Sequence, residues 1–243
     1  MIQPSNAKRI GYECGAVAGA GHGGLFRRSI TLAERERAEE LLEFVGIAHL
    51  AYEGTRNLSV RIEIMKIAKF YLANGYAIVR QCIPVESAAE IRLLVTAMDI
   101  TKRKPNLIEN AQLRQALDDM LKPLYAGMGI QVERLVELAL LIATQSRPVK
   151  LGWHRDRPPD SGIHSFQLPL LPGDRFHELV PSSHNRELTA AEIAARNAGG
   201  QDMPGAVNIE LDVGDILLRS PLIFHRGYNE NGIERLTIVG TYA

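Results

Sequence analysis

The sequence predicts an α+β protein in which a helical front half precedes a mainly β back half, built as a jelly roll or small barrel. Apolar residues recur at helical spacing up to about residue 126. From about residue 137 they fall instead into eight short runs separated by Gly, Pro, Asn and Asp, which is typical of antiparallel two-sheet or closed architectures. The predicted strands are Leu138–Ala143, Val149–Trp153, His164–Leu171, Phe176–Val180, Val207–Leu211, Ile216–Leu218, Leu222–His225 and Leu236–Tyr242.

The front half contains recognisable helix starts and stops. Residues 1–30 read as an irregular glycine-rich segment, and 31–243 as one domain with its strand-rich core at about 137–243. Thr31 and Glu34 have capping-box spacing and begin the first predicted helix. The other front-half elements are a helix at about 60–73 ending at Asn74-Gly75, a strand at Tyr76–Arg80, and helices at Val85–Met98 and about 110–126.

One insert interrupts the predicted strands. Residues 187–205 carry a second capping box, Thr189 with Glu192, and are expected to form a helix and loop at the mouth of the barrel.

Composition excludes several classes of partner. The 243 residues are 46% apolar and 23% charged, with 28 basic and 28 acidic side chains, so no overall field attracts nucleic acid or anionic lipid. No apolar run reaches the roughly 18 residues of a membrane span. Cys14 and Cys82 are too few for a disulfide framework. We therefore expect a cytoplasmic protein that binds neither nucleic acid nor membrane.

The candidate chemistry lies on two predicted strands. His154 and Asp156 are two residues apart on one strand, so their side chains point to the same face. His225 lies at the end of a later predicted strand that could be a neighbour in a jelly roll. Two histidines and one carboxylate that leave three positions open form the ligand set of non-heme iron(II) oxygenases. Zinc with an activated water is the competing interpretation.

Arg235 favours iron over zinc. It stands ten residues after His225 on the next predicted strand, where a bidentate guanidinium can hold the far carboxylate of a dicarboxylic co-substrate. Thr237, two residues further on the same face, could add a hydroxyl hydrogen bond. His164 and His177 lie on or beside strands near the site, and either could be structural or substrate-facing.

These residues, in this order, resemble the phytanoyl-CoA dioxygenase family of iron(II)/2-oxoglutarate oxygenases. The resemblance covers about residues 65–243. It rests on the pattern His154-x-Asp156, His225 and Arg235, and on the flanking segments Phe70–Arg80, Glu178–His184, Leu211–Leu218 and His225–Asn229.

The resemblance implies a fold, a site and a set of cofactors. The fold would be a double-stranded β-helix (jelly roll, cupin-like), with helices from the N-terminal half packed on one sheet. His154, Asp156 and His225 would bind iron, and Arg235 would bind 2-oxoglutarate. Further implied co-substrate residues are Lys150, Gln167 and Thr237. Dioxygen would be the second co-substrate and ascorbate a stimulant.

The implied activity is oxidation, most simply hydroxylation, of an unactivated C–H bond in a small-molecule metabolite, with release of succinate and carbon dioxide. The carboxylate of Asp156 favours hydroxylation over halogenation, since family halogenases carry a small residue there. The substrate is expected to be acidic or a biosynthetic intermediate, and the acidic case rests on the arginines that crowd the motif strands: Arg155, Arg157, Arg219 and Arg226.

Two other functions stay open at this point. One is a cupin-like module whose metal only orients a ligand for binding or isomerisation, which would leave Arg235 without a purpose. The other is a catalytically silent scaffold that acts through the helical first 60 or so residues.

Overall fold

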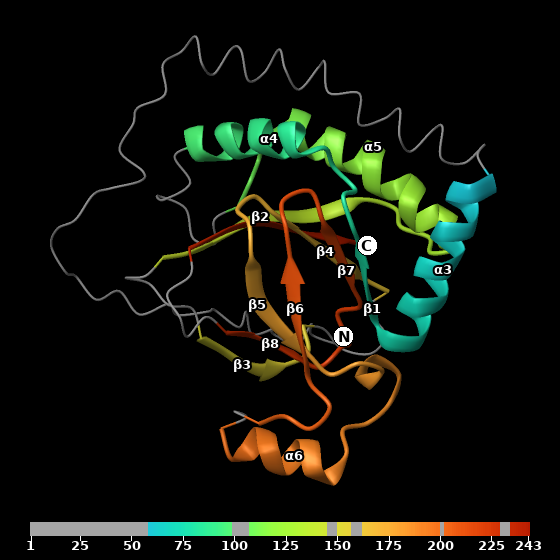
Figure 1. Ribbon diagram of the computed structural model, residues 1–243, viewed down its shortest axis with the longest axis vertical. Helices are drawn as coiled ribbons and strands as arrows, with labels where there is room; N and C mark the ends of the chain where they lie inside the picture. Colours follow the sequence, from blue (N-terminus) through green and yellow to red (C-terminus); the bar gives the residue numbers. More distant parts are fainter. Residues whose placement is uncertain (1–57, 99–106, 145–149, 157–161, 200–201, 229–233) are drawn as a thin grey trace, which may run out of the picture.

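The computed structural model describes residues 58–98, 107–144, 150–156, 162–199, 202–228 and 234–243 (Figure 1). Three parts of the sequence interpretation lie outside these residues. They are the irregular segment 1–30, the helix predicted to begin at Thr31, and the side chain of Arg157. The described helices are α3 (Leu58–Asn74), α4 (Val85–Ala97), α5 (Ala111–Gly127), the 3-10 turn η2 (Ser183–Asn185) and α6 (Ala190–Asn197). The described strands are β1 (Tyr76–Val79), β2 (Leu135–Ala143), β3 (Lys150–His154), β4 (His164–Pro169), β5 (Asp174–Leu179), β6 (Val207–Leu211), β7 (Ile216–Arg219), β8 (His225–Tyr228) and β9 (Arg235–Tyr242).

The strands form two antiparallel sheets. The five-stranded sheet has the order β1-β7-β4-β9-β2, and the four-stranded sheet has the order β3-β8-β5-β6. From β2 onward the chain passes back and forth between the sheets, with only β5 and β6 consecutive in one sheet. This path is that of a double-stranded β-helix, so the predicted fold is confirmed. The front-half strand at Tyr76–Arg80 and seven of the eight predicted back-half strands match to within a few residues, and Leu222–His225 does not.

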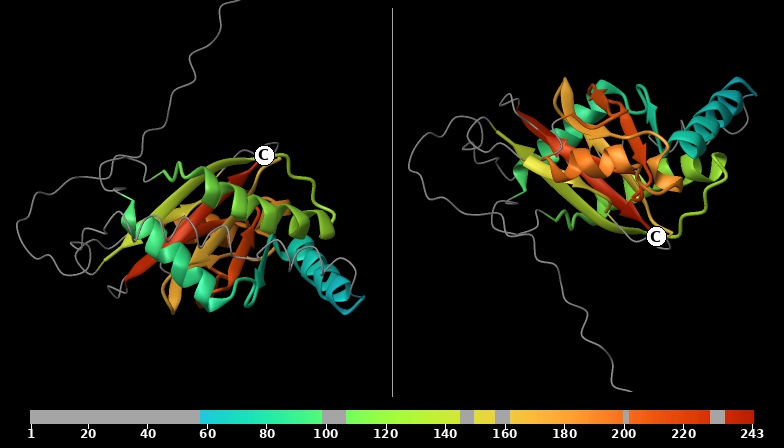
Figure 2. Two further views of the ribbon diagram at one scale, coloured as in Figure 1. Left: turned by 90° about the horizontal axis from the view of Figure 1, so that it is seen from above. Right: turned by 90° about the horizontal axis from the view of Figure 1, so that it is seen from below.

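The alternation of side chains along β4 explains how the fold is layered. Phe166 and Leu168 are fully buried on the outer face of the five-stranded sheet, while Ser165 and Gln167 point to the barrel interior. The apolar outer face packs against α4 and α5, which lie across the sheet (Figures 1 and 2). Burial of this face is the main hydrophobic contribution to the fold. The helices therefore cover one sheet, as predicted.

Gly75 ends α3 and brings a distant segment against it. Its φ of +80° is the left-handed conformation predicted from the Asn-Gly stop. A Cβ at this position would lie 2.5 Å from Nδ1 of His184, whose Nε2 is 3.1 Å from the carbonyl of Leu72. Glycine thus permits η2 to dock on the end of α3. Among the described helices, none is both long and apolar enough to cross a membrane.

The predicted helix in the insert is α6, and its capping box is present. The Thr189 hydroxyl accepts from the Glu192 backbone N–H, and the Glu192 carboxylate accepts from the Thr189 backbone N–H. Arg186 donates to both oxygens of the same carboxylate, at 2.8 and 2.6 Å. These donors lower the pKa of Glu192 to about 2, with the hydrogen bonds from Arg186 contributing most.

Glu192→Gln should therefore lower stability in a pH-dependent way. Glutamine keeps the cap but loses the charge, and we expect about 1 kcal/mol less unfolding free energy at pH 7. Because the folded pKa is lower than the unfolded one, this contribution is complete above about pH 4.5 and is lost as the pH falls towards 2. Urea unfolding of the wild type and of Glu192→Gln between about pH 7 and pH 2 measures this difference in unfolding free energy. A difference that stays constant down to pH 2 would show that the charge of Glu192 is not responsible.

Candidate metal and co-substrate site

The two candidate metal-binding motifs meet because β3 and β8 are antiparallel neighbours. His154, the last residue of β3, is the register partner of His225, the first residue of β8. The predicted strand Leu222–His225 is wrong, because residues before His225 form a turn. In that turn the N–H of Ile223 donates to the carbonyl of Ser220 at 3.2 Å, and the carbonyl of Pro221 accepts from Asp156 N–H at 3.0 Å. The same turn therefore positions both His225 and Asp156.

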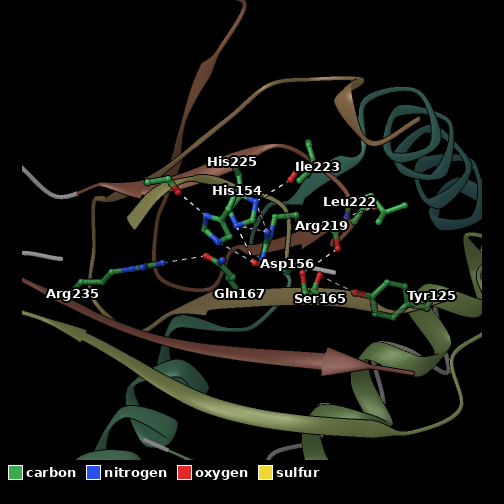
Figure 3. Close-up of polar contacts among 12 residues, drawn as sticks. Tyr125, His154, Asp156, Ser165, Gln167, Arg219, Leu222, Ile223, His225 and Arg235 are labelled. Atoms are coloured by element: carbon green, nitrogen blue, oxygen red, sulfur yellow. Dashed lines mark hydrogen bonds and ion pairs between the residues drawn. The ribbon is translucent and has the colours of Figure 1, made fainter. Parts of the chain in front are cut away.

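The three predicted ligands converge on one point (Figure 3). Nε2 of His154 lies 3.2 Å from Oδ1 of Asp156, and Nε2 of His225 lies 3.5 Å from the same oxygen. One ligand atom from each residue falls within 4.8 Å of the others. Three ligands about 2.1 Å from one ion and at right angles to each other would be about 3 Å apart. The cluster therefore fits a single metal ion bound on one face.

Backbone carbonyls orient both imidazoles. Nδ1 of His154 lies 2.7 Å from the carbonyl of Gly152, and Nδ1 of His225 lies 2.9 Å from the carbonyl of Ile223. A carbonyl can only accept, so each Nδ1 is placed to donate, and each Nε2 is directed toward Oδ1 of Asp156. These contacts fix the ring orientations and would favour the tautomer that a metal requires.

A buried arginine that sequence reasoning did not assign to the site also contacts the triad. Arg219, only 4% exposed, donates from Nη2 to Oδ2 of Asp156 at 2.5 Å and from Nη1 to Nε2 of His225 at 2.6 Å. The sequence interpretation left Arg219 among arginines that crowd the motif strands. One signal was present: Arg219 lies two residues after Leu217, and therefore on the inward face of β7, where it pairs with Ser165.

Arg219 leaves the metal-facing oxygen of Asp156 free. Its Nη2 uses Oδ2, whereas Oδ1 faces both imidazoles, so that contact is compatible with a bound metal. Its contact with Nε2 of His225 uses the lone pair that a metal needs, so metal binding requires this Nη1 to withdraw. The Asp156–Arg219 pair would then hold the carboxylate in a one-oxygen binding mode.

The charge states of Asp156 and His225 suit a metal. Burial opposes ionisation of Asp156, but Arg219 and the two imidazoles together outweigh it and hold the pKa of Asp156 well below its usual range. Burial, reinforced by Arg219, lowers the pKa of His225 to about 3. The hydrogen bond with Asp156 raises the pKa of His154. At neutral pH, Asp156 is therefore a carboxylate and His225 a neutral imidazole, as metal binding requires.

Arg235 lies deeper in the same barrel and is held by a polar network. Its Nε donates to Asp174 at 2.8 Å and to the Thr237 hydroxyl at 3.1 Å, and its Nη2 donates to Gln167 at 3.1 Å. Its guanidinium stacks on the ring of Phe176, 3.8 Å from the ring centre. Nη1 is buried and has no partner among the described residues. Figure 3 shows Gln167 between Arg235 and the triad.

Asp174 and Phe176 were not predicted as site residues. Asp174 follows Pro-Gly, so its sequence context is that of a turn, and nothing in it shows that the carboxylate is buried against Arg235. Phe176 packs closely on Gly227 of β8, where a Cβ would overlap the ring. Lys150 begins β3 opposite Tyr228, but its side chain lies outside the described part of the structure, so its co-substrate role stays a prediction.

The two undecided histidines have different environments. His164 lies on the helix-covered side, where its Nδ1 is 2.7 Å from the Tyr71 hydroxyl, a contact that favours the structural interpretation. His177 is buried in the interior, with its ring centre 6.0 Å from that of His225. Neither of its ring nitrogens has a partner among the described residues. Trp153, next to His154 on β3, stacks on Phe224, with ring centres 5.4 Å apart.

Comparison with solved structures supports the fold. The carbocyclase SnoK of nogalamycin biosynthesis, described as non-heme and α-ketoglutarate-dependent, has a TM-score of 0.58 and 14% identity, over 73% of this chain and 83% of that one. The epimerase SnoN, in complex with Fe3+, α-ketoglutarate and nogalamycin RO, has a TM-score of 0.59 and 17% identity over 74% and 83%. AviO1 from Streptomyces viridochromogenes Tue57 has a TM-score of 0.54 and 24% identity over 73% and 93%. The fold is shared.

At these identities the likeness establishes the fold alone. No protein-family model and no curated protein sequence matches the chain. Any assignment of chemistry therefore depends on the residues inside the barrel.

Proposed function

We propose that this protein is an iron(II)- and 2-oxoglutarate-dependent dioxygenase that oxidises, most simply by hydroxylation, an unactivated C–H bond of a small-molecule metabolite. One observation carries the proposal: three candidate metal ligands and a buried arginine, whose Nη1 has no partner in the described part of the chain, line the same barrel interior. A metal site alone would suit several chemistries. The added guanidinium fits the far carboxylate of a dicarboxylic co-substrate chelated to that metal.

The residues would divide the work in the following way. His154, Asp156 and His225 would hold iron(II), and the Nη1 and Nη2 end of Arg235 would hold the far carboxylate of 2-oxoglutarate. Asp174 would keep that end aimed inward by binding Nε on the opposite edge of the guanidinium. Bound together, iron(II) and 2-oxoglutarate supply the oxidising chemistry with dioxygen, and succinate and carbon dioxide are released.

A cluster of buried apolar side chains also lies in the barrel interior. Buried apolar residues pack together in the interior next to His225 and Arg219, and they would keep bulk water from the reacting groups. They are Leu179, Ile209, Leu211, Leu217 and Ile223.

The resemblance of the motifs to the phytanoyl-CoA dioxygenase family supports the same roles. The solved structures with this fold support them too, because SnoN is described in complex with Fe3+ and α-ketoglutarate and HygX with iron bound. A cupin-like module without oxygen chemistry accounts for the metal cluster, but gives no role to the unpartnered Nη1 of Arg235.

The direct test is formation of succinate from 2-oxoglutarate by iron(II)-loaded protein in air. We expect slow turnover without substrate in the wild type and at least about 100-fold less in His154→Ala, since a ligand to the metal is lost. His184→Ala is the control. It removes a histidine whose ring contacts the Leu72 carbonyl and not the triad, so this variant should retain turnover. Zinc-loaded protein should form no succinate, because zinc has no redox chemistry. Iron-loaded protein that neither binds nor consumes 2-oxoglutarate would contradict the proposal.

A further inference from the structure

One buried histidine of the barrel interior has no role in the site as described so far. His177 is 5% exposed, and neither ring nitrogen has a hydrogen-bond partner among the described residues. Buried polar groups are nearly always hydrogen-bonded, because an unmade bond leaves the full cost of removing the group from water. An imidazole carries both a donor and an acceptor, so a leucine of similar size would fill this place at lower cost. The polar ring therefore needs a ligand to account for it.

The position of His177 indicates which ligand. Its strand, β5, also supplies Asp174, which binds Arg235, and Phe176, which stacks beneath Arg235. The His177 ring lies 5.4 Å from the Phe176 ring on one side and 6.0 Å from the His225 ring on the other, measured between centres. His177 thus stands beside both the metal ligand His225 and the residue that supports Arg235.

His177 is not a fourth metal ligand by geometry. The ligand atoms that cluster within 4.8 Å come from His154, Asp156 and His225 alone among the described residues. Burial and the charges of Arg235, Arg219 and His225 lower the pKa of His177, and the carboxylate of Asp156 opposes them. A neutral imidazole N–H in an interior that also holds guanidinium groups is suited to an anion.

We propose that His177 is a second anchor for 2-oxoglutarate, donating a ring N–H hydrogen bond to a carboxylate oxygen of the co-substrate while Arg235 holds the far carboxylate. The inference rests on the proposed function. It explains two observations together, since the unpartnered donors of His177 and of Arg235 Nη1 would both be satisfied by one dianion. His177 then acts through binding and orientation of the co-substrate, without taking part in metal binding.

Binding of 2-oxoglutarate to iron(II)-loaded protein without oxygen tests this anchor. The visible charge-transfer band of iron(II) with a chelated 2-oxo acid reports binding before any turnover. His177→Leu should raise the Kd for 2-oxoglutarate on the order of 10- to 100-fold and shift the band, while iron affinity stays at the wild-type value. His177→Gln, which restores an N–H donor, should recover most of the affinity. His164→Leu, on the helix-covered side, is the matched control and should bind 2-oxoglutarate normally.

The outcomes separate this inference from the proposed function. Absence of the band in wild-type protein would overturn the proposed function itself. A normal band in the wild type together with unchanged Kd in His177→Leu would overturn only the anchor. If His177→Leu does not fold, an NMR measurement on the wild-type protein tests the anchor. With zinc in place of iron(II), the ring nitrogen signal of His177 in NMR spectra should move when 2-oxoglutarate is added, and an unmoved signal would overturn the anchor.

Discussion

Asp156→Asn should weaken iron(II) binding by more than about 100-fold, which is the largest effect that we expect from a single change of atom type. The amide keeps the size of the side chain but loses the charge that faces both imidazoles. The amide also lacks the second negatively charged oxygen, Oδ2 in Asp156, that accepts from the buried guanidinium of Arg219. Loss of a ligand costs more than the 10- to 100-fold that is typical of an outer hydrogen-bond partner.

A matched change elsewhere separates this effect from a general loss of a carboxylate–arginine pair. Glu178 on β5 binds Arg226 on β8 at 2.7 Å, outside the triad. Glu178→Gln removes a charge of the same kind and should retain iron(II) affinity. Anaerobic iron titration of both variants, with thermal unfolding as a check on folding, gives the comparison. Equal iron affinity in wild type and Asp156→Asn would rule Asp156 out as a ligand.

Arg235→Met should have two separate effects, one on stability and one on co-substrate binding. Asp174 would be left buried without its cation, and breaking such a pair typically costs about 3–5 kcal/mol of unfolding free energy. Affinity for 2-oxoglutarate should also fall, on the order of 100-fold, because a charge-assisted bidentate contact is lost.

A second substitution can separate these effects. Adding Asp174→Asn to Arg235→Met removes the unpaired charge. The amide oxygen can still accept from the backbone N–H of Phe176, and the amide N–H can donate to the Thr237 hydroxyl, which no longer accepts from Arg235. The double variant should therefore regain most of its stability in urea unfolding, yet still bind 2-oxoglutarate weakly. Normal binding by the double variant would show that Arg235 does not hold the co-substrate.

The parts of the site that sequence reasoning located are those that local patterns specify. Alternation along a strand predicted that His154 and Asp156 share a face, and they do converge, although β3 ends at His154 and the turn at Pro221 positions Asp156. The same rule places Arg235 with Thr237 on β9. Capping boxes and the Asn-Gly stop similarly predicted α6 and the end of α3, because these signals act within a few residues.

The parts that were missed depend on contacts between distant segments. Arg219 reaches Asp156 only because β7 and the end of β3 face one interior, 63 residues apart in the chain. Asp174 binds Arg235 across 61 residues, and its Pro-Gly-Asp context indicates a turn. The strand predicted at Leu222–His225 was wrong because apolar side chains of a buried turn look like a strand. One sequence without its pairing register cannot specify such contacts.

The two faces of β4 have different tasks, so the register of this strand matters for function. Phe166 and Leu168 face the helices, and Gln167 faces Arg235, within three consecutive positions. Deleting one residue N-terminal to Phe166 in this strand would exchange the faces, which would place an aromatic ring among the proposed iron and co-substrate residues and an amide in the apolar layer. The strand is hydrogen-bonded to β7 and β9 on its two sides, so it cannot slide independently of them. Tolerance to insertion and deletion should therefore be lowest here, in a segment that contributes no metal ligand.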